Sequence, residues 1–245
     1  MHNHFSSQEF YYYAGATIKF VLGLAVMFLG EALIWMLLFS DTTAIGTADI
    51  FWVFYLHMSA TVTALACYFL MSMSSLWLLI SKKSFFAPII AMASAPTGFY
   101  MTLFALGTGA LFGRPVWGSY WVWDARLSGL LLLIFFFGAF LTFAAPRGMK
   151  HRRTTDVRAA IAALSGIIFV PVFYFLFDLL APMRHEFDKI LVTSNGVDPQ
   201  VLIVSFTLCL VCYAMAMILA RSRTLILERD HRSSWAQDEA LEGNL

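Results

Sequence analysis

The chain has 245 residues, of which 60% are hydrophobic and 13% charged, and its mean hydropathy is +0.75. A soluble domain could not cover its surface with so few charged side chains, so these values indicate a protein whose solvent is largely lipid. The net charge of +1 gives no attraction for nucleic acid. The chain begins without a basic stretch or a signal-peptide cleavage site, so we expect its first apolar segment to stay in the mature protein.

Six apolar segments follow one another along the chain, each long enough to cross a hydrocarbon core of about 30 Å as a helix. They cover approximately residues 17–39, 58–80, 85–107, 127–145, 158–181 and 199–220. Because a helix satisfies its own backbone groups in lipid, we predict an all-α bundle of six transmembrane helices. This bundle forms one domain, 1–221, and is followed by a tail, 222–245.

The basic residues are distributed unevenly between the two sides of the predicted bundle. Of the 16, all but Arg114, Arg126, Arg184 and Lys189 lie in the tails, in the connections 81–84 and 146–157, or beside them. Cytoplasmic segments of membrane proteins are enriched in Lys and Arg, so we predict that both termini are cytoplasmic. Segments 40–57, 108–126 and 182–198 are then external.

The external segment 113–126 is rich in aromatic side chains and contains three of the seven tryptophans. If it is helical from about Val116, four of its side chains share one face. These four are Trp117, Tyr120, Trp121 and Asp124. We therefore predict a short amphipathic, Trp-rich helix between the third and fourth spans.

Two interpretations of this segment remain open. Trp and Tyr often lie at headgroup level, where they form an aromatic belt. Alternatively, a flat aromatic platform flanked by Arg114 and Arg126 suits a planar, apolar ligand that carries carboxylates. Haem is such a ligand.

Two histidines lie near the external boundary, one on each side of the Trp-rich segment in the sequence. His57 lies where segment 40–57 enters the second span, and His185 follows the fifth span. A single histidine at the membrane interface usually only places its polar ring at headgroup level. Two histidines at the same depth favour a site for a metal or a haem iron. Their spacing does not distinguish haem from zinc, although a closed zinc site would need further ligands.

Two acidic residues lie within the apolar segments. Glu31 lies in the first span, where a charge is costly and marks a functional site, unless it is protonated or paired inside the bundle. Asp178 precedes His185 by seven residues and could orient its imidazole, although Pro182 interrupts the helix between them.

The stretch Trp117-Gly-Ser-Tyr-Trp-Val-Trp-Asp-Ala-Arg-Leu-Ser128 resembles the WWD signature of haem-handling membrane proteins. Its ending is similar to that of the cytochrome c maturation protein C family (CcmC, haem exporter protein C) rather than to that of haem lyases. Tyr55-Leu56-His57 resembles the stretch with the family's first external histidine. The interval from Pro171 to His185 matches the interval that precedes the family's second external histidine.

The resemblance implies that His57 and His185 are the axial ligands of a haem b iron. It also implies an aromatic platform with polar residues beside it. The members of this platform are Trp117, Tyr120, Trp121, Trp123, Asp124 and Arg126. Tyr120 stands where the family often has Trp, and Arg184 replaces part of a Trp-containing stretch before the second histidine. Arg114 and Arg184 would be partners for the propionates.

By resemblance, the protein holds haem on the periplasmic side of a bacterial inner membrane, or of a mitochondrial inner membrane, during assembly of c-type cytochromes. The implied partners are a CcmE-like haem chaperone, a CcmA/CcmB-like ABC transporter pair and a small CcmD-like single-span subunit. The sequence shows no constellation for covalent catalysis, so we expect a binding and delivery protein rather than an enzyme. The alternatives are a haem lyase of the same superfamily, and a permease or structural subunit with an aromatic interfacial segment.

Overall fold

The computed structural model describes residues 7–39, 48–81, 84–144, 156–168, 171 and 199–242. The regular structure in these residues is helical throughout. The long helices are α1 (Ser7–Phe39), α2 (Ala48–Ile80), α3 (Phe86–Trp117), α4 (Ala125–Ala144) and α7 (Pro199–Glu242). Residues 156–168 form a shorter helical stretch. Each of the five long helices in the described part contains an apolar stretch long enough to cross a membrane.

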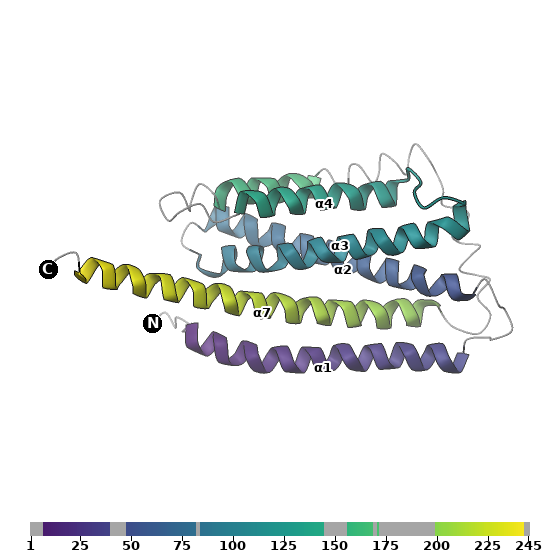
Figure 1. Ribbon diagram of the computed structural model, residues 1–245, viewed down its shortest axis with the longest axis horizontal. Helices are drawn as coiled ribbons and strands as arrows, with labels where there is room; N and C mark the ends of the chain where they lie inside the picture. The colour runs from purple at the N-terminus through teal and green to yellow at the C-terminus, as the bar shows by residue number, and fades with distance from the viewer. Residues whose placement is uncertain are drawn as a thin grey trace.

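The helices lie side by side along one axis (Figure 1). Helix α7 packs against α1, α2 and α3, and helix α3 also packs against α2 and α4. The start of α1 and the end of α7 lie at the same end of the bundle. The connection 118–124 between α3 and α4 lies at the opposite end, which we call the loop end.

The described helices confirm an all-helical membrane bundle, but they are longer than the apolar segments in the sequence. Helix α2 begins at Ala48 rather than near residue 58, and α3 ends at Trp117 rather than near residue 107. Helix α7 continues through the expected tail to Glu242. Hydropathy marks the part of a helix that suits lipid, whereas the helix itself continues until a capping residue ends it. The expected span 158–181 begins in the helical stretch 156–168, and most of its second half lies outside the described residues.

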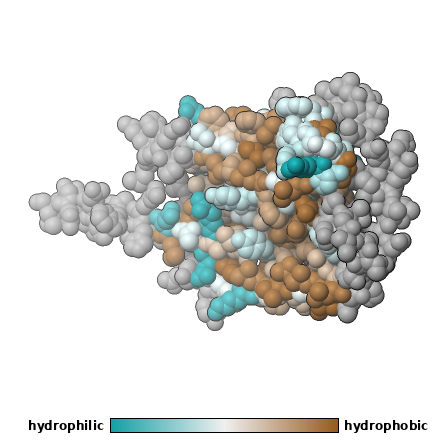
Figure 2. All heavy atoms as spheres, turned by 45° about the vertical axis from the view of Figure 1, so that its right-hand side comes forward, coloured by the Kyte–Doolittle hydropathy of each residue, from teal (hydrophilic) through white to brown (hydrophobic). Residues whose placement is uncertain are grey.

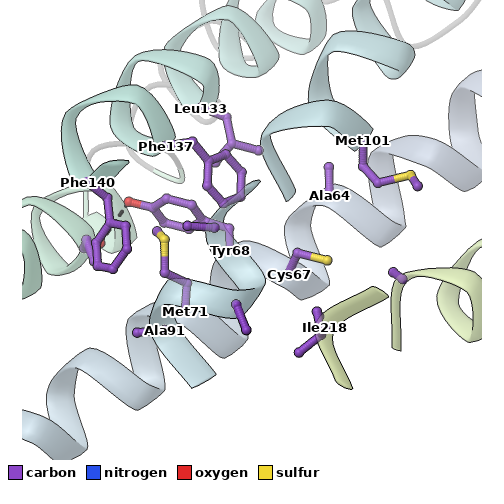
Figure 3. Close-up of a cluster of buried hydrophobic side chains, with 14 of the residues drawn as sticks. Ala64, Cys67, Tyr68, Met71, Ala91, Met101, Leu133, Phe137, Phe140 and Ile218 are labelled. Carbon is purple, nitrogen blue, oxygen red and sulfur yellow. Dashed lines mark hydrogen bonds between the residues drawn. The ribbon is translucent and has the colours of Figure 1, made fainter. Parts of the chain in front are cut away.

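The larger buried cluster joins α2, α3, α4, α7 and the stretch 156–168, and many of its members are alanines. Tyr68 of α2 lies inside it (Figure 3). The Tyr68 ring stands edge-on to the Phe137 ring of α4, with centroids 5.1 Å apart, and its hydroxyl donates to the carbonyl oxygen of Ala163 at 2.7 Å. One side chain therefore connects three helical elements.

A second buried cluster lies toward the loop end, where α1, α2, α3 and α7 meet. Its buried members are Ala32, Phe54, Tyr55, Phe112, Leu202 and Phe206. Leu56 and Met58 also pack against it, so the residues on both sides of His57 are anchored in this cluster. It fixes the part of α2 that carries the first candidate ligand.

The outer surface of the bundle suits lipid. Large apolar side chains are exposed on it, among them Leu37, Val26 and Phe20, at 82%, 70% and 68%. Figure 2 shows hydrophobic residues over much of the described part of one face, with most hydrophilic residues toward the end that carries the termini. The chain is therefore a multi-pass membrane protein.

Candidate functional site

His57 is buried within helix α2 rather than lying in an external connection. Its side chain is 8% exposed, and its Nδ1 lies 2.8 Å from the carbonyl oxygen of Ala105 in α3. A carbonyl oxygen only accepts hydrogen bonds, so Nδ1 carries the proton and Nε2 carries the lone pair. A hydrogen bond of this kind sets the tautomer and orientation of histidines that ligate metals.

The sequence placed His57 at the end of the external segment 40–57, and the structure shows that this part of the chain is helical. Helix α2 begins at Ala48, so His57 lies in its third turn. Phe54 and Tyr55, just before His57, are buried in the second cluster, at 3% and 4% exposure. The packing of these aromatic side chains stabilises the helix before the apolar segment that the sequence marks from about residue 58.

Small residues on α3 make room for the His57 ring. Ala105, Gly109 and Gly113 recur at every fourth position and are all buried, so they lie on one face of α3. A Cβ on Gly109 would lie 2.9 Å from both Cε1 and Nδ1 of His57. Such small residues let two membrane helices approach closely. The four-residue spacing of these small residues indicates a close helix approach in the sequence, but not which side chain of the neighbouring helix they receive.

The predicted amphipathic helix in segment 113–126 is wrong. Helix α3 continues to Trp117 and ends at Gly118, which has a φ of +73° and whose N–H donates to the Arg114 carbonyl oxygen at 2.9 Å. Glycine adopts this left-handed conformation without the steric cost of a Cβ, so it stops the helix. Residues 118–124 are not helical, and α4 begins at Ala125. The expected shared helical face therefore does not form.

The tryptophans of this connection form a corner rather than a flat platform. The rings of Trp121 and Trp123 are 5.4 Å apart at an interplanar angle of 83°. Two perpendicular rings cannot both stack on one planar ligand, so only one of them can lie flat against it. Trp117 packs differently, edge-on against Phe112 of α3 at 6.2 Å.

The indole nitrogen of Trp121 is a buried donor. Trp121 Nε1 is shielded from solvent and finds no hydrogen-bond partner among the described residues. Buried donors in proteins are nearly always paired, and an unpaired one calls for an explanation such as a ligand. Trp123, by contrast, is 69% exposed.

Asp124 is buried and caps helix α4. Its Oδ1 accepts a hydrogen bond from the backbone N–H of Leu127 at 2.8 Å, which is the N-cap arrangement. The charges of Asp124 and of Arg126 also act on the His57 ring. The structure thus brings the start of α4 close to a histidine that lies far away in the sequence.

Arg114 is held by Tyr120. Its guanidinium lies over the Tyr120 ring, 4.8 Å from the centroid, and it donates a hydrogen bond to the Tyr120 hydroxyl. The remaining predicted site residues, His185 and Arg184, lie outside the described residues, as does Asp178. Their approach to His57 stays a prediction.

The described part of the site fits haem. It offers an imidazole with its Nε2 lone pair directed by a backbone hydrogen bond, aromatic rings, a buried N–H donor and arginine side chains. Within the described ranges, no three His, Cys, Asp or Glu side chains gather closely enough to hold a bare metal ion. Haem needs fewer protein ligands, because the porphyrin supplies four and the protein only the axial ones.

Comparison with known proteins finds the same family by a family model and by individual relatives. The family model CcmC, heme exporter protein C, matches residues 1–237. Heme exporter protein C of Rhodobacter capsulatus is 31% identical over 157 residues, which cover 64% of this chain and 63% of that protein. The Escherichia coli K12 protein of the same name is 27% identical over 192 residues, covering 76% of this chain and 74% of its own. The Haemophilus influenzae protein of this name is 26% identical over 218 residues, which cover 87% of this chain and 86% of that protein.

Proposed function

The chain belongs to the CcmC family of heme exporter proteins, and we propose that it binds haem at the loop end of the bundle and delivers it to a haem chaperone during assembly of c-type cytochromes. The observation that carries this proposal is His57, whose Nδ1 is bonded to Ala105 so that Nε2 is left as the ligating atom. Haem is the cargo, and the protein's part is to bind, orient and release it.

Each residue of the proposed site has a separate task. His57 binds the iron on one side, and His185 is the second axial ligand. One indole of the pair Trp121 and Trp123 covers a face of the porphyrin, and Trp121 Nε1 donates to an acceptor on the haem. Delivery requires that one imidazole give way to a ligand of the receiving protein.

The arginines supply positive charge to the proposed site. Arg114, Arg126 and Arg184 would balance the two propionates through charge-assisted hydrogen bonds. Arg114 is already oriented by Tyr120. In this proposal the platform consists of Trp117, Tyr120, Trp121, Trp123, Asp124 and Arg126, with Asp124 acting through the backbone of α4.

The proposed orientation follows from the basic residues, most of which lie in the tails and in or beside the connections 81–84 and 146–157 of the sequence. The loop end then faces the periplasm of a bacterial inner membrane. In this setting we propose the partners of the family's maturation system: a CcmE-like chaperone, a CcmA/CcmB-like ABC transporter pair and a CcmD-like subunit.

Absorption spectra of the purified, haem-loaded protein test the ligand assignment. We expect the wild type to show the sharp α and β bands of a six-coordinate reduced haem, because two imidazoles bind the iron. His57→Ala and His185→Ala should each shift or remove these bands, whereas the control His151→Ala should not. Wild-type spectra for both site variants, together with normal cytochrome c assembly, would show that the ligands lie elsewhere.

A second role for the connection is an interfacial anchor, because Trp123 and Tyr120 are 69% and 51% exposed. The variant Trp121→Ala separates the two roles. If the platform binds haem, this variant loses haem occupancy at an unchanged protein level in the membrane. If the connection is only an anchor, haem loading per molecule stays the same.

A further inference from the structure

Glu31 lies on the outer surface of the bundle, in the apolar part of α1. Its side chain is exposed, and no described residue pairs with it. Pairing inside the bundle, one of the alternatives from the sequence, is therefore not found in the described part of the chain. The apolar span Tyr13–Leu37 continues six residues beyond Glu31, or about 9 Å. A glutamate side chain is too short to cover that distance, so its carboxyl group lies within the apolar span.

Helix α1 uses only one of its sides to pack against the bundle. The residues buried on this side are Ala14, Val21, Ala25 and Ala32, and the element that α1 packs against in the described part is chiefly α7. The opposite side of α1 carries a second row of residues, spaced alternately three and four positions apart in the sequence, which we call the outer stripe. The outer stripe consists of Phe20, Gly23, Met27, Gly30 and Ile34, with Glu31 at its edge.

The outer stripe has the form of a helix-packing surface. Alternating spacings of three and four are those at which one helix receives the side chains of another. A Cβ on Gly23 or Gly30 would have no atom within 4 Å, so both glycines leave open notches. Glycines in such a row allow a neighbouring membrane helix to approach closely. Phe20, Met27 and Ile34, at 68%, 55% and 57% exposure, would flank it.

We propose that the outer stripe binds a transmembrane helix of another polypeptide, which presents a lysine or arginine to Glu31. A carboxylate in hydrocarbon is costly unless it is protonated or paired, and a lysine or arginine of a neighbouring helix supplies the pairing that the described part of this chain does not. Lipid headgroups do not supply it, because they stay at the interface. A second copy of this chain would insert in the same direction and place another carboxylate at the same depth, where like charges repel.

This docking surface lies at the depth of the second buried cluster. Ala32, next to Glu31 in the chain, is a member of that cluster together with Phe54 and Tyr55. These two aromatic residues precede His57 by three and two positions. A partner helix at the outer stripe therefore contacts α1 on the side opposite the cluster that anchors the histidine.

The proposal can be tested with the full-length protein and synthetic helices in phosphatidylcholine vesicles. The probes are Leu/Ala helices of about 24 residues that carry Lys, Leu or Glu at the depth of Glu31. Energy transfer between labels on the protein and on the helix reports association. We expect the wild type to bind the Lys helix roughly five- to tenfold more tightly than the Leu helix. Glu31→Gln should abolish this preference, and Glu31→Lys should transfer it to the Glu helix.

Two further variants test the shape of the surface. Gly30→Leu fills a notch of the outer stripe and should weaken binding of both the Lys and the Leu helix. Gly107→Leu is the matched control, because an added Cβ at Gly107 on α3 also has no atom within 4 Å. The haem spectrum should remain that of the wild type in all these variants. Equal binding of the Lys and Leu helices, or self-association of the protein that depends on Glu31, would overturn the proposal.

Discussion

The position of the His57 ring depends on a residue that has no side chain. The ring donates from Nδ1 to Ala105 and lies directly against the backbone of Gly109. A Cβ at position 109 would lie 2.9 Å from two ring atoms, closer than side chains tolerate, so the ring would have to move. Moving it stretches the bond to Ala105 and redirects Nε2, the atom that would ligate iron.

We therefore expect Gly109→Ala to lower haem occupancy and to change the reduced absorption bands. The lost hydrogen bond alone is worth about 1 kcal/mol, and the displaced ligand adds to this cost. The measurement is haem content and spectrum of the purified protein at equal protein concentration. Gly107→Ala is the control on the same helix, since a Cβ there has no atom within 4 Å. Normal haem content and spectrum in Gly109→Ala would contradict this dependence.

At this scale the sequence indicated which kinds of residue to expect, but not their contacts. His57 and the tryptophans stand out because such side chains are unusual in a membrane segment. Ala105 does not stand out, because its contribution to the site is a backbone carbonyl that every residue possesses. Its role follows only from the packing of α2 on α3, and that packing is a tertiary property.

At the scale of the elements, the connection between α3 and α4 is defined by its two caps. Gly118 ends α3 in a left-handed conformation, and Asp124 begins α4 by accepting from the N–H of Leu127. Only six residues lie from 118 to 123, so the caps fix where the tryptophans of this connection stand. The aspartate of the WWD segment is thus a structural residue of α4 as well as a neighbour of His57.

The capping role predicts a difference between two substitutions of Asp124. Asp124→Ala should lower the free energy of unfolding by about 1 kcal/mol, because the orphan N–H groups of α4 lose their acceptor. Asp124→Asn keeps an acceptor oxygen and should retain stability within a few tenths of a kcal/mol of the wild type. Thermal unfolding in detergent measures both. The capping role is contradicted if Asn destabilises the protein as much as Ala does.

The haem spectrum of Asp124→Asn adds a second result. A wild-type spectrum is expected, because the carboxylate acts through the backbone of α4 and its oxygen acceptor is retained. Loss of haem at full stability would instead show that the negative charge itself is required.

The sequence predicted the existence of the helices better than their ends. Apolar runs of the observed length can hardly be anything but membrane helices, so five of the six expected spans overlap long helices of the described part. The Trp-rich helix failed because its pattern rested on four residues between Trp117 and Asp124, a stretch too short to outweigh a glycine stop at 118. Gly118 and Asp124 are themselves the signals of a helix end and a helix start.

At the scale of the whole molecule, close packing of small residues replaces the hydrophobic effect as the force between helices. Lipid tails are as apolar as the core, so helices associate through van der Waals contact and hydrogen bonds. The larger cluster shows both, with its buried alanines and the Tyr68 hydroxyl bonded to Ala163 (Figure 3). The residues around His57 are anchored chiefly in the second cluster, whereas Ala105, which accepts the hydrogen bond from its ring, belongs to the larger one.

Gly98 lies seven residues, or about two turns, before Ala105 on α3, so we expect a fault at Gly98 to weaken the fold more than it changes the site. A Cβ on Gly98 would overlap the Phe137 ring and lie 2.9 Å from the Cβ of Cys67, at the point where α2, α3 and α4 meet. Gly98→Ala should therefore lower the free energy of unfolding by about 1–3 kcal/mol, the usual cost of overpacking. Gly138→Ala, on α4 where a Cβ has no atom within 4 Å, is the matched control. Thermal unfolding in detergent gives the stability, and the absorption spectrum below the transition should match the wild type. A changed spectrum in Gly98→Ala would show that the fault reaches the site, and unfolding identical to that of Gly138→Ala would show that position 98 tolerates the added Cβ.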